Sequence, residues 1–279
     1  MATAPGLPHF IVIGAMKCGT TTLYRHLADH PQIDMSRDKE TDFFVAEKNW
    51  DRGLDWYAAQ FSGRGPVRGE ASPNYTKRRD FPGVPARIAA ACPEVRLIYI
   101  LRDPVARAES QLRHGIIMGD LSPAAEGFTD SHEYAHILDA SRYAHQLEPY
   151  LAQFGRAAIL VLDFDDLRRD PQTVMDRVHA HVGVAPRPIG RAGAANDSRE
   201  LARVPAPALR FARSPLGRRV AGLVGRDTRD RIRAALARGR DRRPEALPEA
   251  LRARMRDDLA PDAARLRAMT GLDFPGWSV

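Results

Sequence analysis

Residues 10–22 read FIVIGAMKCGTTT, and this stretch decides the fold that we expect for the chain. The apolar run His9–Ala15 is rich in β-branched residues and predicts a buried strand. The pattern over Thr20–Asp29 predicts a helix, so Gly14–Gly19 becomes a tight loop between the two elements. Backbone N–H groups at the start of such a helix bind anions, phosphate above all. The stretch therefore predicts a phosphate-binding loop in an α/β protein.

The lysine of this loop separates it from the commonest phosphate loop. The glycines have the spacing of the Walker A motif G-x-x-x-x-G-K-[ST], but Thr20 occupies the place of the motif's lysine. Lys17 lies inside the loop instead, two residues before Gly19. A Walker lysine reaches the β- and γ-phosphates, whereas Lys17 is placed for a group one phosphate from the ribose. We expect a ligand with a 5′-phosphate and one further anionic group; the competing interpretation is a glycine-rich turn with a lysine by chance.

The remaining apolar runs complete the fold prediction. Arg96–Asp103 and Ala157–Asp163 are two further buried strands, and Pro66–Glu70 is a shorter one. Helical patterns separate them, and strands that alternate with helices are typical of a mostly parallel sheet. We therefore expect an α/β, P-loop-like three-layer sandwich in which helices flank a central, mostly parallel sheet. The helices are expected at residues 85–91, 104–114, 141–154 and 171–182.

The pattern changes after residue 184. We expect one domain over residues 1–279, with a core at about 9–184 and an Arg-rich, peripheral helical extension at about 185–279. The chain has a net charge of +7, and residues 199–267 hold nineteen arginines against nine acidic residues. A basic surface of this kind attracts phosphate, sulfate or acidic glycans, but solvated helix faces in an arginine-rich composition are the simpler explanation.

Cysteine content and hydropathy bear on the location of the protein. Cys18 and Cys92 are the two cysteines, which fits a reduced environment. The N-terminal residues lack the pattern of a secretory signal, and no apolar run approaches the ~20 residues of a membrane span. These features lead us to expect a cytoplasmic protein without a membrane span.

Two segments together resemble a known family. Residues 10–27, FIVIGAMKCGTTTLYRHL, closely resemble the 5′-phosphosulfate loop of sulfotransferases that use 3′-phosphoadenosine 5′-phosphosulfate (PAPS), particularly the heparan-sulfate and Golgi-type branch. Residues 97–111, LIYILRDPVARAESQ, supply the arginine and the serine, Arg102 and Ser110, that bind the 3′-phosphate of PAPS in that family. The resemblance implies a sulfotransferase that releases PAP. The cofactor-binding residues that it implies are Lys17, Cys18, Gly19, Thr20, Thr21, Thr22, Arg102 and Ser110.

Weaker matches extend the resemblance toward the acceptor side. RDKETDFF at residues 37–44 is similar to the family's KE-x-x-FF stretch, and GEASPNYT at residues 69–76 is similar to a substrate-cleft loop. The first match implies that Glu40 takes the acceptor's proton, beside Lys17 as the second catalytic residue. The alternative is that Glu40 only pairs with a neighbouring cation such as Lys39, and His114 is the second choice as base. Residues 186–246 match poorly, and AANDSRE at 194–200 is the nearest stand-in for the segment that covers the nucleotide.

Other functions compete with this interpretation. A P-loop small-molecule kinase would use Mg-ATP, which the position of Lys17 disfavours. A non-catalytic protein that binds anions or nucleic acid could use the arginine-rich region, but no nucleic-acid-binding module is present and we expect no nucleic-acid partner. His132-Glu133-x-x-His136 matches the H-E-x-x-H pattern of zinc proteases without the usual third ligand spacing. We expect no metal requirement, because lysine and arginine supply the positive charge.

The acceptor is open at this stage. The family implies a hydroxyl or an amine on a small molecule, a glycan or a lipid, and a fold does not specify its substrate. The oligomeric state is not readable from the sequence either.

Overall fold

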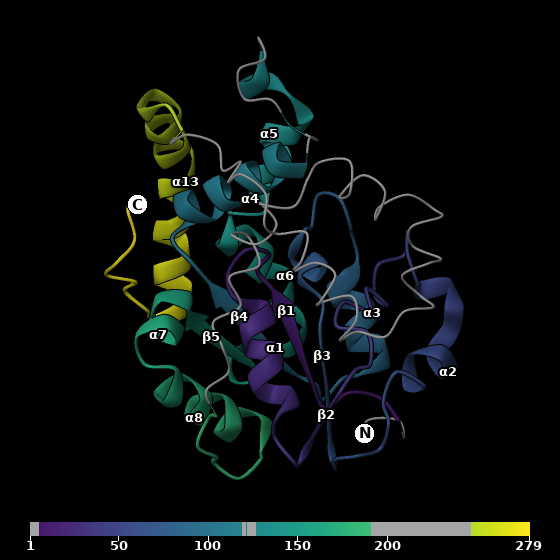
Figure 1. The fold of residues 1–279 in the computed structure, drawn as a ribbon. Coiled ribbons are helices and arrows are strands. Elements are labelled where there is room, and N and C mark those ends of the chain that lie inside the picture. The colour runs from purple at the N-terminus through teal and green to yellow at the C-terminus, as the bar shows by residue number, and fades with distance from the viewer. Residues whose placement is uncertain (1–5, 119–120, 122–126, 191–246) are drawn as a thin grey trace, which may run out of the picture.

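A five-stranded parallel sheet forms the centre of the molecule (Figure 1), as the computed structural model shows. The structure describes residues 6–118, 121, 127–190 and 247–279. The strands lie in the order β2-β3-β1-β4-β5, and every neighbouring pair is parallel. The predicted α/β class with a flanked parallel sheet is confirmed. The strands are β1 (Phe10–Gly14), β2 (Ile33–Met35), β3 (Val67–Ala71), β4 (Arg96–Leu101) and β5 (Ile159–Asp163).

Helices cover both faces of this sheet, with α1 in front and α6 behind in the view of Figure 1. All five residues of β1 and five of the six in β4 are buried, as expected of strands covered on both sides. The helices are α1 (Thr20–Ala28), α2 (Gly53–Ala58), α3 (Val84–Ala91), α4 (Pro104–Met118), α5 (His132–Asp139), α6 (Tyr143–Phe154), α7 (Phe164–Arg169), α8 (Pro171–Val182) and α13 (Glu249–Thr270).

Most predicted boundaries fall within a few residues of the observed ones, but four elements differ. The helix predicted over 104–114 continues to Met118 as α4. Strand β2 and helices α2 and α7 were not predicted, because three residues for the strand and six for each helix are too few to establish a hydrophobic period. A short strand like β2 forms because β3 offers its edge: Ile33 pairs with Val67 and Met35 with Gly69.

The C-terminal helix α13, drawn in yellow in Figure 1, packs against the core instead of lying at its periphery. Its Leu266 belongs to the main hydrophobic core, and its Met255 and Leu259 belong to a second core shared with α4 and α5. Its Asp262 accepts hydrogen bonds from the first amides of α6. The peripheral placement expected for this helix is therefore corrected. The single-domain assignment remains a prediction, because residues 191–246 lie outside the described part.

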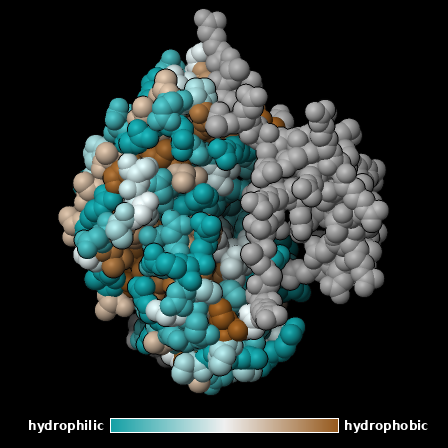
Figure 2. Space-filling model, turned by 60° about the vertical axis from the view of Figure 1, so that its left-hand side comes forward, coloured by the Kyte–Doolittle hydropathy of each residue, from teal (hydrophilic) through white to brown (hydrophobic). Residues whose placement is uncertain are grey.

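The described surface is largely polar. On the face drawn in Figure 2, apolar residues occur in small groups between hydrophilic ones. Leu54 is the one large hydrophobic side chain among the described residues that counts as exposed. Within the same residues, no helix is both long enough and apolar enough to cross a membrane.

Candidate active site

The candidate residues gather where the parallel strands end. Because all five strands run the same way, the segments that follow them meet at one edge of the sheet, where ligands of open α/β sheets bind. The phosphate loop follows β1, the segment with Glu40 follows β2, and Arg102 follows β4. The topology thus brings the three predicted parts of the site to the same edge.

The phosphate loop has the backbone that its glycines allow. Gly19 is the residue before α1 and has a φ of 87°, in the left-handed region where glycine is favoured. A Cβ at Gly19 would lie 2.5 Å from the ring of Phe164, and a Cβ at Gly14 would lie 2.1 Å from Thr76 Oγ1. Lys17 also has a positive φ, of 71°. Thr76 at one end of the loop and Phe164 at the other leave no room for a Cβ, so only glycine fits at positions 14 and 19.

Cys18 contributes to this loop as a buried thiol. Its Sγ lies 3.6 Å from Tyr143 Oη, and the side chain is fully buried. Burial raises the pKa of the Cys18 thiol to about 11, so it stays protonated at neutral pH. The thiol holds the loop against α6, and the backbone N–H of Cys18 donates to the carbonyl of Ala15 at 3.2 Å.

Tyr143 joins the phosphate loop to Arg102. Its hydroxyl donates to the carbonyl of Arg102 at 2.9 Å while it contacts Cys18 Sγ. The guanidinium of Arg102 lies over the ring of Phe164, 5.6 Å from its centre, and the same ring touches Gly19. The structure thus brings Arg102 beside the loop, as predicted. Sequence reasoning missed Tyr143 and Phe164, although both stand at the first position of a helix.

Ser110 and the hydroxyls of the loop lie on helices that start at this edge. Ser110 is half-buried on α4, eight residues after Arg102. Thr20 is buried as the first residue of α1, whereas Thr21 and Thr22 are partly exposed on its first turn. Their contacts with a nucleotide remain a prediction.

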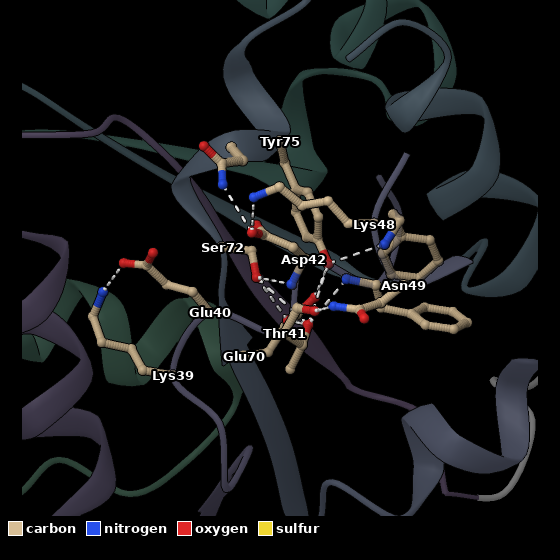
Figure 3. A network of polar contacts seen from close by, with 12 residues as sticks. Lys39, Glu40, Thr41, Asp42, Lys48, Asn49, Glu70, Ser72 and Tyr75 are labelled. Carbon is tan, nitrogen blue, oxygen red and sulfur yellow. Dashed lines mark hydrogen bonds and ion pairs between the residues drawn. The ribbon is translucent and has the colours of Figure 1, made fainter. Parts of the chain in front are cut away.

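Glu40 lies on an exposed part of the segment that follows β2. Half of its side chain is accessible, and its Oε1 accepts from Lys39 Nζ at 2.7 Å. Figure 3 shows this pair apart from the polar network to which the next residue, Thr41, belongs. The ion pair with Lys39 is the alternative role that the sequence suggested. The role of Glu40 as a base remains a prediction.

Glu70, near the end of β3, is the centre of that network. It is fully buried, and four hydroxyl groups donate to its carboxylate. Burial raises the pKa of Glu70, and the four donors oppose that rise. The sequence pointed to GEASPNYT only as a cleft loop and missed this role. The donors are Thr41, Tyr57, Ser72 and Tyr75.

The network fixes the backbone next to Glu40. Thr41 bonds Glu70, and the amide of Asp42 donates to Ser72 Oγ at 3.1 Å. Asp42 is itself buried, has a φ of 46°, and accepts from Lys48 and from Asn74. The loop is therefore held immediately after Glu40.

Two cations at the same edge have no carboxylate partner among the described residues. Arg107 on α4 is fully buried; it donates to the carbonyl of Ile137 at 2.7 Å and to Ser141 Oγ at 2.5 Å, and its Nη1 has no partner there. Burial lowers the pKa of Arg107. Lys77 follows the short 3₁₀ turn at residues 73–76 and is half-buried. The edge thus carries positive charge beyond Lys17 and Arg102.

The H-E-x-x-H pattern occupies the start of α5. Its two histidine rings stack at 6.4 Å, and Nδ1 of His136 contacts a carboxylate oxygen of Asp80. Burial lowers the pKa of His136. Across the part of the chain that the structure describes, no three His, Cys, Asp or Glu side chains group as a metal site. His136 therefore acts as a partner of Asp80.

Comparison with known proteins identifies similar chains. The family model described as sulfotransferase domain matches residues 7–192. Bifunctional heparan sulfate N-deacetylase/N-sulfotransferase 4 of Mus musculus is 34% identical over 206 residues, covering 66% of this chain and 23% of that protein. Heparan sulfate glucosamine 3-O-sulfotransferase 3B1 of the same species is 31% identical over 187 residues, covering 64% of this chain and 46% of that protein. This chain thus spans between 23% and 46% of the length of these two curated relatives.

A solved structure matches over nearly the full length. A sulfotransferase from Alicyclobacillus acidocaldarius superposes with a TM-score of 0.71 at 25% sequence identity, covering 98% of this chain and 99% of that one. The structural match thus covers more of the chain than the family model, which ends at residue 192.

Proposed function

This chain belongs to the sulfotransferase domain family, and on that premise we propose that it transfers a sulfuryl group from PAPS to a hydroxyl or amine and releases PAP. The observation that carries the proposal is the connected unit of phosphate loop and strand-end arginine. Lys17 stands inside the loop, and Arg102 is tied to that loop through Tyr143 and Phe164. One nucleotide with anionic groups at both its 5′ and 3′ positions would engage both.

The nucleotide-binding residues act by charge and alignment. Sulfuryl transfer, like phosphoryl transfer, needs the attacking and leaving oxygens in line and the developing charge stabilised. Lys17 and the backbone amides of residues 17–22 neutralise the charge that grows on the oxygen bridging sulfur and the 5′-phosphate. Arg102 and Ser110 hold the 3′-phosphate, since a guanidinium and a hydroxyl suit a phosphate dianion. These cations supply the charge without a metal ion.

Glu40 accepts the proton of the acceptor in this proposal. Its carboxylate is exposed and has a single described partner, Lys39, so one of its oxygens can receive a proton without dismantling other contacts. A positioned base contributes about 10²–10⁴-fold to a rate. The acceptor atom in this proposal is a nitrogen or an oxygen, since one relative is named as an N-sulfotransferase and the other as a 3-O-sulfotransferase. A small molecule, a glycan and a lipid are its candidate carriers.

Thermal unfolding with nucleotides tests the proposed cofactor. PAP at 100 times its dissociation constant should stabilise the fold by about 2.7 kcal/mol. We expect this shift without magnesium, and a much smaller one with ADP, which lacks the 3′-phosphate. Stabilisation by ADP with magnesium but not by PAP would contradict the proposal and favour the kinase alternative. Acceptor-dependent release of PAP from PAPS that chelators leave unchanged would support a metal-free reaction.

A further inference from the structure

Lys77 begins beside the phosphate loop. The preceding residue, Thr76, places its Oγ1 where a Cβ of Gly14 would lie, only 2.1 Å away. Gly14 is both the last residue of β1 and the first of the loop. The backbone of Lys77 is therefore fixed next to the loop, on the side of β3 and away from Arg102 on β4.

Charged groups from several elements surround the ammonium of Lys77. Arg107 of α4 and Lys48 of the segment that follows β2 repel this ammonium, whereas Asp80 and Asp42 attract it. Both acids are already engaged: Asp42 accepts from Lys48 and Asn74, and Asp80 pairs with His136 of α5. Within the described residues, no carboxylate forms an ion pair with Lys77. The ammonium of Lys77 thus has cations and already engaged carboxylates as its charged neighbours, and no ion-pair partner among the described residues.

Such an ammonium favours an incoming anion. Removing a cation from water costs free energy unless an opposite charge compensates. Burial, with the repulsion from Arg107 and Lys48, lowers the pKa of Lys77 to about 8. An anion bound at this position would relieve both the desolvation and the repulsion.

We infer that Lys77 is a further catalytic residue, whose ammonium binds the sulfuryl group while it moves from PAPS to the acceptor. The inference rests on the proposed function. With the 3′-phosphate at Arg102 and the 5′-phosphate at the loop, the sulfuryl group is the part of PAPS that lies beyond the loop, toward the segment with Glu40. The chain brings Lys77 next to the phosphate loop, and Lys48 and Asp42 of the segment that follows β2 are among the charged groups around its ammonium.

In this step the acceptor oxygen or nitrogen forms a bond to sulfur as the bond between sulfur and the 5′-phosphate oxygen breaks. The leaving oxygen keeps the bonding electron pair and departs with PAP, and the acceptor's proton goes to Glu40. Lys77 exchanges no proton. Its charge stabilises the non-bridging sulfuryl oxygens, while Lys17 stabilises the leaving oxygen.

Binding of PAPS and of PAP separates this role from a structural one, because only PAPS carries the sulfuryl group. Lys77→Met should weaken PAPS by about tenfold or more, the usual range for a lost charged hydrogen bond, and leave PAP within about twofold. Lys77→Arg should retain the preference for PAPS. Arg79→Met removes an exposed cation two residues away and should change neither affinity.

The pH dependence gives a second measurement. The kcat/KM for PAPS in the wild type should fall as the pH rises through about 8, where Lys77 loses its proton. Arginine stays charged throughout that range, so Lys77→Arg should remove this fall. The groups that face Lys77 and share this environment are Arg107, Lys48, Asp42, Asp80 and His136.

The outcomes distinguish the two proposals. A wild type that neither binds PAP nor turns over PAPS overturns the proposed function itself. A wild type that does both, with Lys77→Met changing PAPS and PAP affinity equally or changing only the KM of the acceptor, overturns the role of Lys77 alone.

Discussion

Glu40 and Glu70 lie at the same edge of the sheet, yet their surroundings are opposite. Glu70 is fully buried and accepts from four hydroxyl groups, whereas Glu40 is half exposed and has Lys39 as its described partner. A fully buried carboxylate with all its oxygens engaged can hold a loop in place but is out of reach of a bound acceptor, whereas an exposed carboxylate can receive the acceptor's proton. Figure 3 shows the two roles side by side: the buried acid fixes Thr41, and the exposed one precedes it.

The largest effect should come from neutralising the exposed acid. Glu40→Gln should lower turnover by about 10²–10⁴-fold, because the amide cannot take the acceptor's proton, and leave PAP affinity within a few-fold. Steady-state kinetics and PAP titration measure the two quantities. Glu47→Gln, an exposed glutamate on the same segment, is the matched control. Near-normal turnover in the Glu40 variant would show that Glu40 is not the base, and its contrast with Glu70 would then be one of exposure alone.

Removing the buried acid should act on the fold. Glu70→Ala leaves four buried hydroxyl groups without their acceptor and should lower the free energy of unfolding by roughly 3–5 kcal/mol. Urea denaturation of the two proteins measures the difference. A loss below about 1 kcal/mol would show that the network does not hold the loop.

The raised pKa of Glu70 gives this site a pH dependence. The folded state binds the Glu70 proton more tightly than the unfolded state, whose pKa is the ordinary 4.5. The resulting stability is fully present below pH 4.5 and is lost as the pH rises through the folded pKa. Relative to Glu70→Gln, the wild type should therefore be less stable at pH 7 than at pH 4.5. Parallel denaturation curves at the two pH values check the sign.

The smallest effect should come from the partner of the exposed acid. The Lys39–Glu40 pair is partly exposed, and such pairs contribute about 0–1 kcal/mol. Lys39→Ala should therefore change the free energy of unfolding by less than about 1 kcal/mol and keep turnover within a few-fold. A loss comparable to that of Glu70→Ala would mean that Lys39 holds the loop as firmly as the buried network does.

The nucleotide side was predictable because its information is local. The buried runs of β1 and β4 end directly before the phosphate loop and Arg102, so reading along the chain placed both groups. The acceptor side was not, because its donors converge on Glu70 from residues 41, 57, 72 and 75. No sequence period places Tyr57 against Glu70. The altered pKa of Lys77 depends on Arg107 and Lys48, which come close to it only in the folded chain. The segment expected to cover the nucleotide, within 186–246, lies almost wholly outside the described residues.

Asp262 of α13 has a consequence for the order in which the protein matures. It accepts hydrogen bonds from the amides of Ala144 and His145, the former 118 residues earlier in the chain. Those amides begin α6, whose first residue, Tyr143, contacts Cys18 and Arg102. During synthesis, residues 10–163 leave the ribosome with every strand of the sheet but without the cap on this helix. All five strands thus precede Asp262 in the chain, and the helix start that carries Tyr143 gains this acceptor only after residue 262 has emerged.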